Sequence, residues 1–568
     1  METVNVLNDR TGKYEKAIEN LKQARDIKLK SIPENALFMA STYNNIAMVY
    51  RHKLAYELSL EYYNKVLNIE LESLPELHPN IASTYNNIAL LLNQLNRYDE
   101  ALDNYMKALK IEEKSLPSNH YQIGTAYNNI ALLYNNINDH IKALDFYEKS
   151  LTIFCNTLEH DHPPIASIYY NMGDVHYKLG NNDTAMHYFQ KALDIRLKSL
   201  PNDHIDLAAT LNSIGVIYLI RENFTDALKH CEQAVKIQLK SSQNNHPDLA
   251  NIHFNLGRIN LKLNQYDKAL EHFHASQTIM TKIYKDDHHD LELLYFHIGN
   301  TYLLLENYQK SIEYCEKSLQ HQLKKPNSDK DHLVTIYKCM GLAFNKLGKY
   351  VESTKKFKKA FEIQSELQNQ LEMIEIIARL GENYHKQSNY TEALKNCKKA
   401  IEIQSNLSPI NNINLTTLYS NIAYANLANQ NYQEAIACFK TVLDLQFKYL
   451  SLNDPNIIRI YNNIGSIYRQ LNDYDTALEI FTKVTEVEKF LQMNSFEYTK
   501  ILNNIGFIYC QQEKLTNALH HFQKALEIQL ILNDIQPEDI AVTYNNIASI
   551  YLRQNKFDLA FVNAKKST

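Results

Sequence analysis

One small residue recurs at almost constant spacing along this chain, and that recurrence constrains the fold more than any other feature. The residue is Ala or Gly, and most steps between its thirteen occurrences are forty-two positions long. The thirteen are Ala47, Ala89, Ala131, Gly173, Gly215, Gly257, Gly299, Gly341, Gly381, Ala423, Gly465, Gly506 and Ala548. A second small residue follows each of them twelve positions later, from Ser59 to Ala560. A fixed period of this length predicts stacked structural repeats.

Each repeat contains two amphipathic segments. In residues 79–120, apolar residues recur every three or four positions from Ile81 to Leu92, and again from Tyr98 to Ile111. That spacing is typical of one apolar face on each of two helices, and no strand-like alternation competes with it. Small residues at fixed phase let two helices approach closely while larger side chains interdigitate around them. The sequence therefore predicts a series of helix pairs.

The signature Thr-Tyr-Asn-Asn-Ile-Ala at residues 84–89 resembles the tetratricopeptide repeat. In that family aromatic, apolar and small residues of a first helix precede small, aromatic and small residues of a second. The matching residues here are Tyr85, Ile88, Ala89, Ala101, Tyr105 and Ala108. The repeat length of forty-two, the Asn-Asn pair and the linker from Leu74 to Ala82 resemble the kinesin light chain type of this repeat. The resemblance implies an all-α fold, a tetratricopeptide-repeat solenoid in which antiparallel helix pairs form a right-handed superhelix.

The strength of the match varies along the chain and predicts four regions. They are a partial first repeat (1–36), strong-consensus repeats 1–6 (37–288), degenerate repeats 7–9 (289–412), and repeats 10–13, the last one short (413–568). A single repeat cannot bury its apolar face alone, so terminal repeats need a polar cap. No polar capping helix is evident at either end, and we expect the chain to be a fragment of a longer protein.

Asparagine occupies the position two residues before the small residue in nine of the thirteen repeats. We call this set the asparagine ladder; its members are Asn45, Asn87, Asn129, Asn171, Asn255, Asn421, Asn463, Asn504 and Asn546. Helix propensity does not explain the recurrence, because Asn is a middling helix former. In tetratricopeptide arrays the stacked first helices line a concave groove, and the resemblance puts this position in it. An amide offers both donors and an acceptor to the backbone of an extended peptide. The ladder is therefore predicted to bind peptides.

An alternative interpretation is that these amides hold the repeats together. The residue before each ladder position is often Asn as well, and could serve the groove or a neighbouring repeat. This second set comprises Asn44, Asn86, Asn128, Asn212, Asn462, Asn503 and Asn545. The ladder is interrupted between residues 288 and 412, where Cys339 and Arg379 replace Asn. We therefore expect two binding stretches, within residues 36–287 and 413–568.

Histidine precedes the first helix of six consecutive repeats, at a spacing of forty-two positions. The six are His78, His120, His162, His204, His246 and His288. A shared metal ion needs nitrogens within about 2.1 Å of it, whereas equivalent points on packed helices are about 10 Å apart. We predict helix capping or linker packing for these residues, and no metal site.

The cysteines follow the repeat rather than a reactive pattern. Cys231, Cys315 and Cys397 stand at the aromatic position of the second helix, where Cys acts as a small core residue. No paired Cys spacing, phosphate-binding Gly loop, nucleophile elbow or metalloprotease helix occurs in the sequence. We expect no cofactor and no enzyme activity.

The composition limits the partners and the compartment. A net charge of −5 on 568 residues gives no basic excess for nucleic acid. No apolar run approaches the roughly 20 residues that span a bilayer, and the first ten residues have no secretory pattern. We predict a cytoplasmic protein that binds neither nucleic acid nor the membrane interior.

Together these features predict a non-catalytic protein–protein interaction scaffold that binds extended peptide segments of other proteins in its concave groove. The resemblance to kinesin light chains implies a cargo-adaptor role, although those proteins carry a heptad coiled coil before fewer repeats and this chain has no sustained heptad segment. A second hypothesis is a regulatory or recognition region separated from a catalytic domain, such as an ADP-ribosyltransferase or a nucleotide-switch protein. A third is an architectural spacer whose ladder amides are paired within the array.

Overall fold

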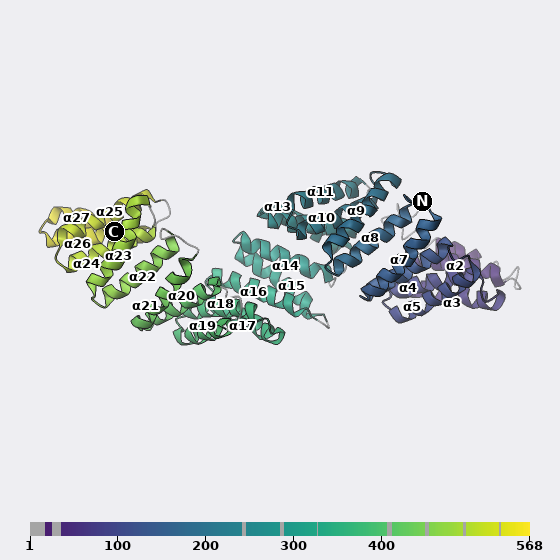
Figure 1. The fold of residues 1–568 in the computed structure, drawn as a ribbon, viewed down its shortest axis with the longest axis horizontal. Coiled ribbons are helices and arrows are strands. Elements are labelled where there is room, and N and C mark those ends of the chain that lie inside the picture. The colour runs from purple at the N-terminus through teal and green to yellow at the C-terminus, as the bar shows by residue number, and fades with distance from the viewer. Residues whose placement is uncertain are drawn as a thin grey trace. The chain divides into compact units, whose positions relative to one another are not determined.

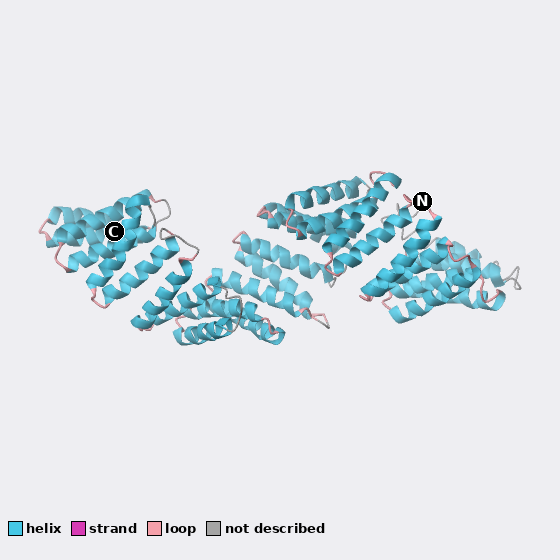
Figure 2. Ribbon diagram, in the orientation of Figure 1, coloured by secondary structure: helices cyan, strands magenta, loops and turns pink. Residues whose placement is uncertain are grey.

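The computed structural model is helical along nearly all of the chain that it describes (Figure 2). It describes residues 17–24, 26, 36–240, 246–283, 289–325, 328–405, 412–448, 454–491, 496–532 and 536–567. Within these ranges no residue belongs to a strand. The chain divides into two compact units, unit 1 (Met1–Asp286) and unit 2 (Asp287–Thr568). The all-α prediction is confirmed.

The helices of each unit follow one another in pairs, and most of them are labelled in Figure 1. We call the first member of a pair helix A and the second helix B. Unit 1 contains α2 (Ala36–His52), α3 (Tyr56–Ser73), α4 (Pro79–Gln94), α5 (Tyr98–Ser115), α6 (Tyr121–Asn136), α7 (His140–Thr157), α8 (Pro163–Lys178), α9 (Asn182–Ser199), α10 (Ile205–Ile220), α11 (Phe224–Lys240), α12 (Pro247–Lys262) and α13 (Tyr266–Ile283).

Unit 2 repeats the arrangement, with even-numbered helices as helices A. It contains α14 (His289–Leu304), α15 (Tyr308–Leu323), α16 (Lys330–Lys346), α17 (Tyr350–Leu367), α18 (Gln370–Lys386), α19 (Tyr390–Ser405), α20 (Asn412–Ala428), α21 (Tyr432–Gln446), α22 (Pro455–Gln470), α23 (Tyr474–Leu491), α24 (Phe496–Gln511), α25 (Leu515–Ile531), α26 (Pro537–Arg553) and α27 (Phe557–Ser567). The predicted four-region division of the sequence stays a prediction.

Histidines cap several helices A, as the sequence predicts. In four of them Nδ1 accepts the backbone N–H two residues further on, at 3.2–3.3 Å. These are His78, His120, His204 and His246. His162 precedes α8 without such a bond, and His288 lies outside the described residues. The capping satisfies one of the N–H groups that a helix start leaves without a partner.

The turn from helix A to helix B uses a left-handed residue seven positions after the small residue. It is Gly at Gly180 and Gly348, with φ of 77° and 72°. Elsewhere it is often Asn, but Leu54 and Glu222 adopt the same conformation, with φ of 60° and 57°. A left-handed residue ends a helix and reverses the chain within a few residues, so the two helices of a pair run antiparallel.

The small residue of helix A is required by the close approach of helix B. A Cβ atom added at Gly257 would lie 2.5 Å from the ring of Phe273, and one at Gly173 would lie 2.7 Å from the ring of Phe189. Core packing leaves no space for such an atom. The side chains at the Phe273 position are buried in other pairs too, at Tyr63, Tyr105, Tyr147, Phe357, Phe439 and Phe481.

A buried polar side chain near the end of helix B faces the next helix A. Glu70 accepts a hydrogen bond from Thr84 Oγ1 at 2.7 Å, and Gln322 Nε2 donates to the carbonyl oxygen of Asp329 at 2.9 Å. Gln occupies this position repeatedly and is buried at Gln238, Gln322, Gln364, Gln404 and Gln529. This set of buried polar residues is not among the sequence-based predictions.

Candidate functional site

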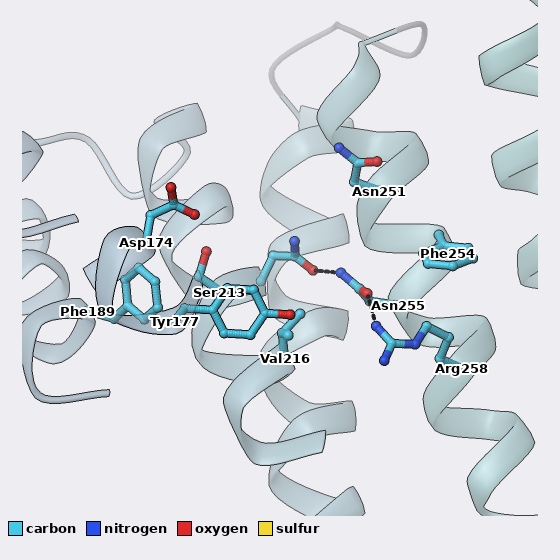
Figure 3. A pocket seen from close by; sticks show the side chains of 10 residues that line it. Asp174, Tyr177, Phe189, Ser213, Val216, Asn251, Phe254, Asn255 and Arg258 are labelled. Atoms are coloured by element: carbon cyan, nitrogen blue, oxygen red, sulfur yellow. Dashed lines mark hydrogen bonds between the residues drawn. The ribbon is translucent and has the colours of Figure 1, made fainter. Parts of the chain in front are cut away.

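Three successive helices A of unit 1, α8, α10 and α12, form a pocket of about 270 Å³ (Figure 3). One lining residue, Phe189, comes from a helix B. The helix A residues that line it are Asp174, Tyr177, Asn212, Ser213, Val216, Asn251, Phe254, Asn255 and Arg258. The pocket therefore lies on the surface that the stacked helices A present, which we call the helix A surface.

The ladder position belongs to the helix A surface. Ser213 and Asn255 both stand two residues before the small residue of their helices, and both line the pocket. Because each repeat places equivalent residues at the same helical phase, the other ladder residues of unit 1 occupy corresponding points on α2, α4, α6 and α8.

Asn255 is engaged within the array. Its Nδ2 donates to Asn212 Oδ1 at 3.1 Å, and its Oδ1 accepts from Arg258 Nη1 at 3.4 Å (Figure 3). The residue is only 8% exposed. One of its two donor hydrogens thus joins α12 to α10, and its oxygen is engaged within α12. Asn255 therefore holds successive repeats together.

The pocket has one charged residue on each of two opposite walls, and the two residues differ in their ion-pair partners. Asp174 is 3.0 Å from Lys178 Nζ and accepts from Asn135 Nδ2 at 3.1 Å. Arg258, on the opposite wall, forms no ion pair with a carboxylate of the described residues. Burial lowers the pKa of its guanidinium, which lies over the ring of Phe254 at 5.8 Å. Arg258 stands three residues after a ladder position on the same helical face, a periodicity by which the sequence alone could have identified it.

Three ladder residues of unit 2 also bind neighbouring helices. Asn421 Nδ2 donates to the carbonyl oxygen of Ala378 at 3.1 Å, and Asn463 Nδ2 donates to the Tyr424 hydroxyl at 3.0 Å. Asn504 Nδ2 donates to Asn462 Oδ1 at 2.8 Å. Each bond joins one helix A to the helix A before it, as the alternative interpretation of the ladder expects.

The four ladder residues at the start of unit 1 differ from these; they are Asn45, Asn87, Asn129 and Asn171. Within the described part of the chain, none of their side chains forms a hydrogen bond, and Asn546 of α26 is like them. Asn45 is exposed and the other three are half-buried. We call these four the N-terminal asparagine tract.

Four members of the second asparagine set form contacts between helices of the array. Asn86 Nδ2 donates to Glu112 Oε1 at 3.1 Å, and Asn503 Nδ2 donates to Thr543 Oγ1 at 2.9 Å. Asn212 accepts the hydrogen bond from Asn255, and Asn462 accepts the one from Asn504.

The described ranges contain neither a membrane-spanning helix nor a metal-site cluster. No helix there is long and apolar enough to cross a membrane. No cluster of three or more His, Cys, Asp or Glu side chains in that part of the chain has the arrangement of a metal site. The seven cysteines are reduced.

Protein-family models of the tetratricopeptide repeat match most of the chain. One matches residues 38–114, 122–198, 206–282, 261–324, 290–366, 414–488 and 497–568. A second model of the same repeat matches residues 374–407. Among curated proteins, no match is found.

Several solved structures are similar to parts of the chain. BtubC (BKLC) from P. vanneervenii is 20% identical over 41% of this chain and 90% of its own, with a TM-score of 0.35. A putative kinesin light chain from Podosopora anserina with nearly identical repeats is 21% identical over 37% and 99%, with a TM-score of 0.32. The apo form of RapI is 17% identical over 50% and 97%, with a TM-score of 0.37. Similarity of this size carries no conclusion about function.

Proposed function

The chain belongs to the tetratricopeptide repeat family, and from this premise we propose that it is a non-catalytic scaffold that binds an extended segment of a partner protein along the helix A surface of unit 1. Repeats of this kind stack into extended surfaces suited to long, unfolded ligands. The same proposal places the protein in the cytoplasm. It also includes an adaptor role, in which the protein joins a cargo to other proteins. A net charge of −5 favours protein over nucleic acid as the partner.

The observation that carries the proposal is the contrast within the ladder. Asn255, Asn421, Asn463 and Asn504 bond neighbouring helices, whereas the N-terminal asparagine tract leaves its amides available on the same face. An amide both donates and accepts hydrogen bonds, so it can bind the backbone N–H and C=O groups of a peptide rather than its side chains. Each bond contributes about 1 kcal/mol net, so several in a row are needed for useful affinity.

The spacing of the tract suits an extended ligand. Packed helices lie about 10 Å apart, and an extended chain advances about 3.3 Å per residue. Successive amides would therefore meet roughly every third residue of the peptide. A peptide that continued beyond Asn171 would reach the pocket between α8 and α12, where Arg258 and Tyr177 lie.

A selection experiment tests the proposal. Random displayed peptides of about ten residues, long enough to cross four helices A when extended, are selected on the immobilised full chain. We expect enriched peptides whose Kd rises by about fivefold or more when one internal backbone amide is N-methylated, because that removes a donor that contributes about 1 kcal/mol or more. Failure to enrich any peptide over a denatured-protein control, or indifference to N-methylation at every position, would overturn it.

A further inference from the structure

Two buried thiols meet at a boundary between helix pairs in unit 2. Cys315 on α15 and Cys339 on α16 place their Sγ atoms 3.3 Å apart. Cys315 is fully buried and Cys339 is 4% exposed. Ser311 Oγ lies 3.9 Å from Cys339 Sγ. Both cysteines are reduced in this structure.

The repeat register produces this contact. Cys315 stands at the aromatic position of helix B, and Cys339 stands at the ladder position of the next helix A. Two repeats further along, Cys397 and Asn421 have the same relationship. Burial raises the pKa of the Cys397 thiol to about 12, and a hydrogen bond with the Asn421 side chain opposes that rise. The contact thus recurs with different residues, and it is a property of the fold rather than of one side-chain rotamer.

We propose that Cys315 and Cys339 are a modification site at which hydrogen peroxide forms a reversible intramolecular disulfide. The two sulfur atoms need to approach from 3.3 Å to about 2.05 Å. Such a bond covalently joins α15 to α16, and so joins one helix pair to the next. This modification is independent of the proposed peptide-binding surface, which lies in unit 1.

The oxidation proceeds in two steps. The Cys339 thiolate attacks one peroxide oxygen, the O–O bond breaks, hydroxide leaves, and Cys339 becomes a sulfenic acid. The Cys315 thiolate then attacks Cys339 Sγ, the S–O bond breaks, and the hydroxyl group leaves as water after taking up a proton. Two thiols are oxidised to one disulfide, and one peroxide is reduced to two water molecules. An external dithiol reverses the reaction by exchange.

The local environment sets which cysteine reacts first. A hydrogen bond from Cys315 lowers the pKa of the Cys339 thiol, and Cys339 is the more exposed of the two. A core this closed admits peroxide more readily than a glutathionyl group, which would need space that neither residue has. The sulfenic acid that forms on Cys339 lies next to Cys315, so a disulfide forms before further oxidation.

Peptide mapping of the full chain tests the proposal. The folded protein is treated with hydrogen peroxide, quenched, alkylated under denaturing conditions and digested with trypsin. We expect the peptide Ser311–Lys317 linked to Cys339–Lys346 as the main disulfide product, lost on treatment with dithiothreitol. The matched control is Cys231→Ser, which changes a cysteine at the same helix B position whose counterpart on the next helix A is Asn255 rather than a cysteine; it should retain the linked peptide.

The wild-type protein alone decides the outcome, so a variant that fails to fold does not affect it. Cys315→Ser and Cys339→Ser should each abolish the linked peptide. The proposal is overturned if Cys155 and Cys438, which are half-buried, are oxidised while Cys315 and Cys339 are recovered as alkylated thiols. Disulfides joining random pairs of cysteines in equal amounts would also overturn it.

Discussion

Asn255 on α12 donates to Asn212 on α10 at 3.1 Å, and the bond joins the two asparagine positions of successive repeats. The same relationship recurs in unit 2, where Asn504 donates to Asn462 at 2.8 Å. In the N-terminal asparagine tract the corresponding residue for Asn129 is Asn86, whose Nδ2 donates to Glu112. The Oδ1 atom of Asn86 has no hydrogen-bond partner among the described residues, and Asn129 makes no bond to it. The engaged ladder amides therefore differ from the available ones in whether a group one repeat earlier accepts their hydrogen bond.

Glu112 gives a pH-dependent prediction. Burial raises the pKa of its carboxyl group to about 7, against the opposing hydrogen bond from Asn86. The folded state then binds the proton more tightly than the unfolded state. The contribution of Glu112 to folding stability is therefore full below about pH 4.5 and is lost as pH rises through 7. Glu112→Gln, the residue found at this position of several other repeats, should stabilise the chain by about 1 kcal/mol at pH 8 and much less at pH 5. Urea unfolding at both pH values measures this.

The matched control for that variant is Glu72→Gln, which removes an exposed carboxylate from the end of α3. Its unfolding midpoint should follow that of the wild type at both pH values. An equal effect of Glu112→Gln at pH 5 and pH 8 would contradict the assignment of a titrating buried carboxyl group.

The buried side chain of His253 should make folding stability depend on pH in the opposite direction. Burial, reinforced by His272, lowers the pKa of His253 to about 4, and the two Nδ1 atoms are 3.1 Å apart. The unfolded state binds the proton more tightly, so stability is full above about pH 6.5 and is lost as pH falls towards 4. His253→Tyr, which introduces the residue present at this phase as Tyr127 and Tyr169, should reduce the loss of stability between pH 7 and pH 4.5. Thermal unfolding across that range tests it, and an unchanged slope would contradict it.

Gly257 should not tolerate a methyl group. The added Cβ of Gly257→Ala meets the Phe273 ring at 2.5 Å, and relief of such overpacking typically costs about 1–3 kcal/mol. Hydrogen exchange of α12 and α13 should accelerate accordingly. The double variant Gly257→Ala with Phe273→Leu should recover part of the protection, because the ring is the atom group that the methyl meets. Equal destabilisation of both variants would argue against this contact.

Leu54 occupies a turn that favours Gly. Its φ of 60° lies in the left-handed region, which costs a residue with a Cβ about 1 kcal/mol, and its side chain is 68% exposed. Leu54→Gly should therefore stabilise the chain by about 0.5 kcal/mol. Gly180→Leu, at the same turn with φ of 77°, should destabilise it by a similar or larger amount. Thermal melts of the two variants should shift in opposite directions.

The fold could be predicted from the sequence because every repeat shows the same spacing of small and apolar residues. The small residues, the helix B aromatics and the histidine caps each follow from one period. The roles of the ladder residues could not be read in that way, since all nine share one phase. Whether an amide is engaged depends on whether a group one repeat earlier, such as Asn212 Oδ1, accepts its hydrogen bond.

The Cys315–Cys339 contact was missed for a related reason. The repeat pattern gives each cysteine a position within its own repeat, whereas the contact joins helix B of one pair to helix A of the next. Arg258 does not belong to the ladder position, although it lies three positions later on the same face of the helix.

The most direct test of the account compares two triple variants with a selected peptide. Asn87→Ala, Asn129→Ala and Asn171→Ala together remove three amides of the N-terminal asparagine tract. Asn421→Ala, Asn463→Ala and Asn504→Ala remove three amides that bond neighbouring helices. The measurement is the Kd of the peptide by isothermal titration calorimetry, with the thermal unfolding midpoint of each variant beside it.

The account predicts that the first triple variant binds roughly 100-fold more weakly, from three bonds of about 1 kcal/mol each, and unfolds at the wild-type temperature. The second should bind within about threefold of the wild type and unfold at a lower temperature, because it leaves buried partners unsatisfied. Wild-type affinity in the first variant, or loss of its folding, would contradict the claim that the tract binds a partner.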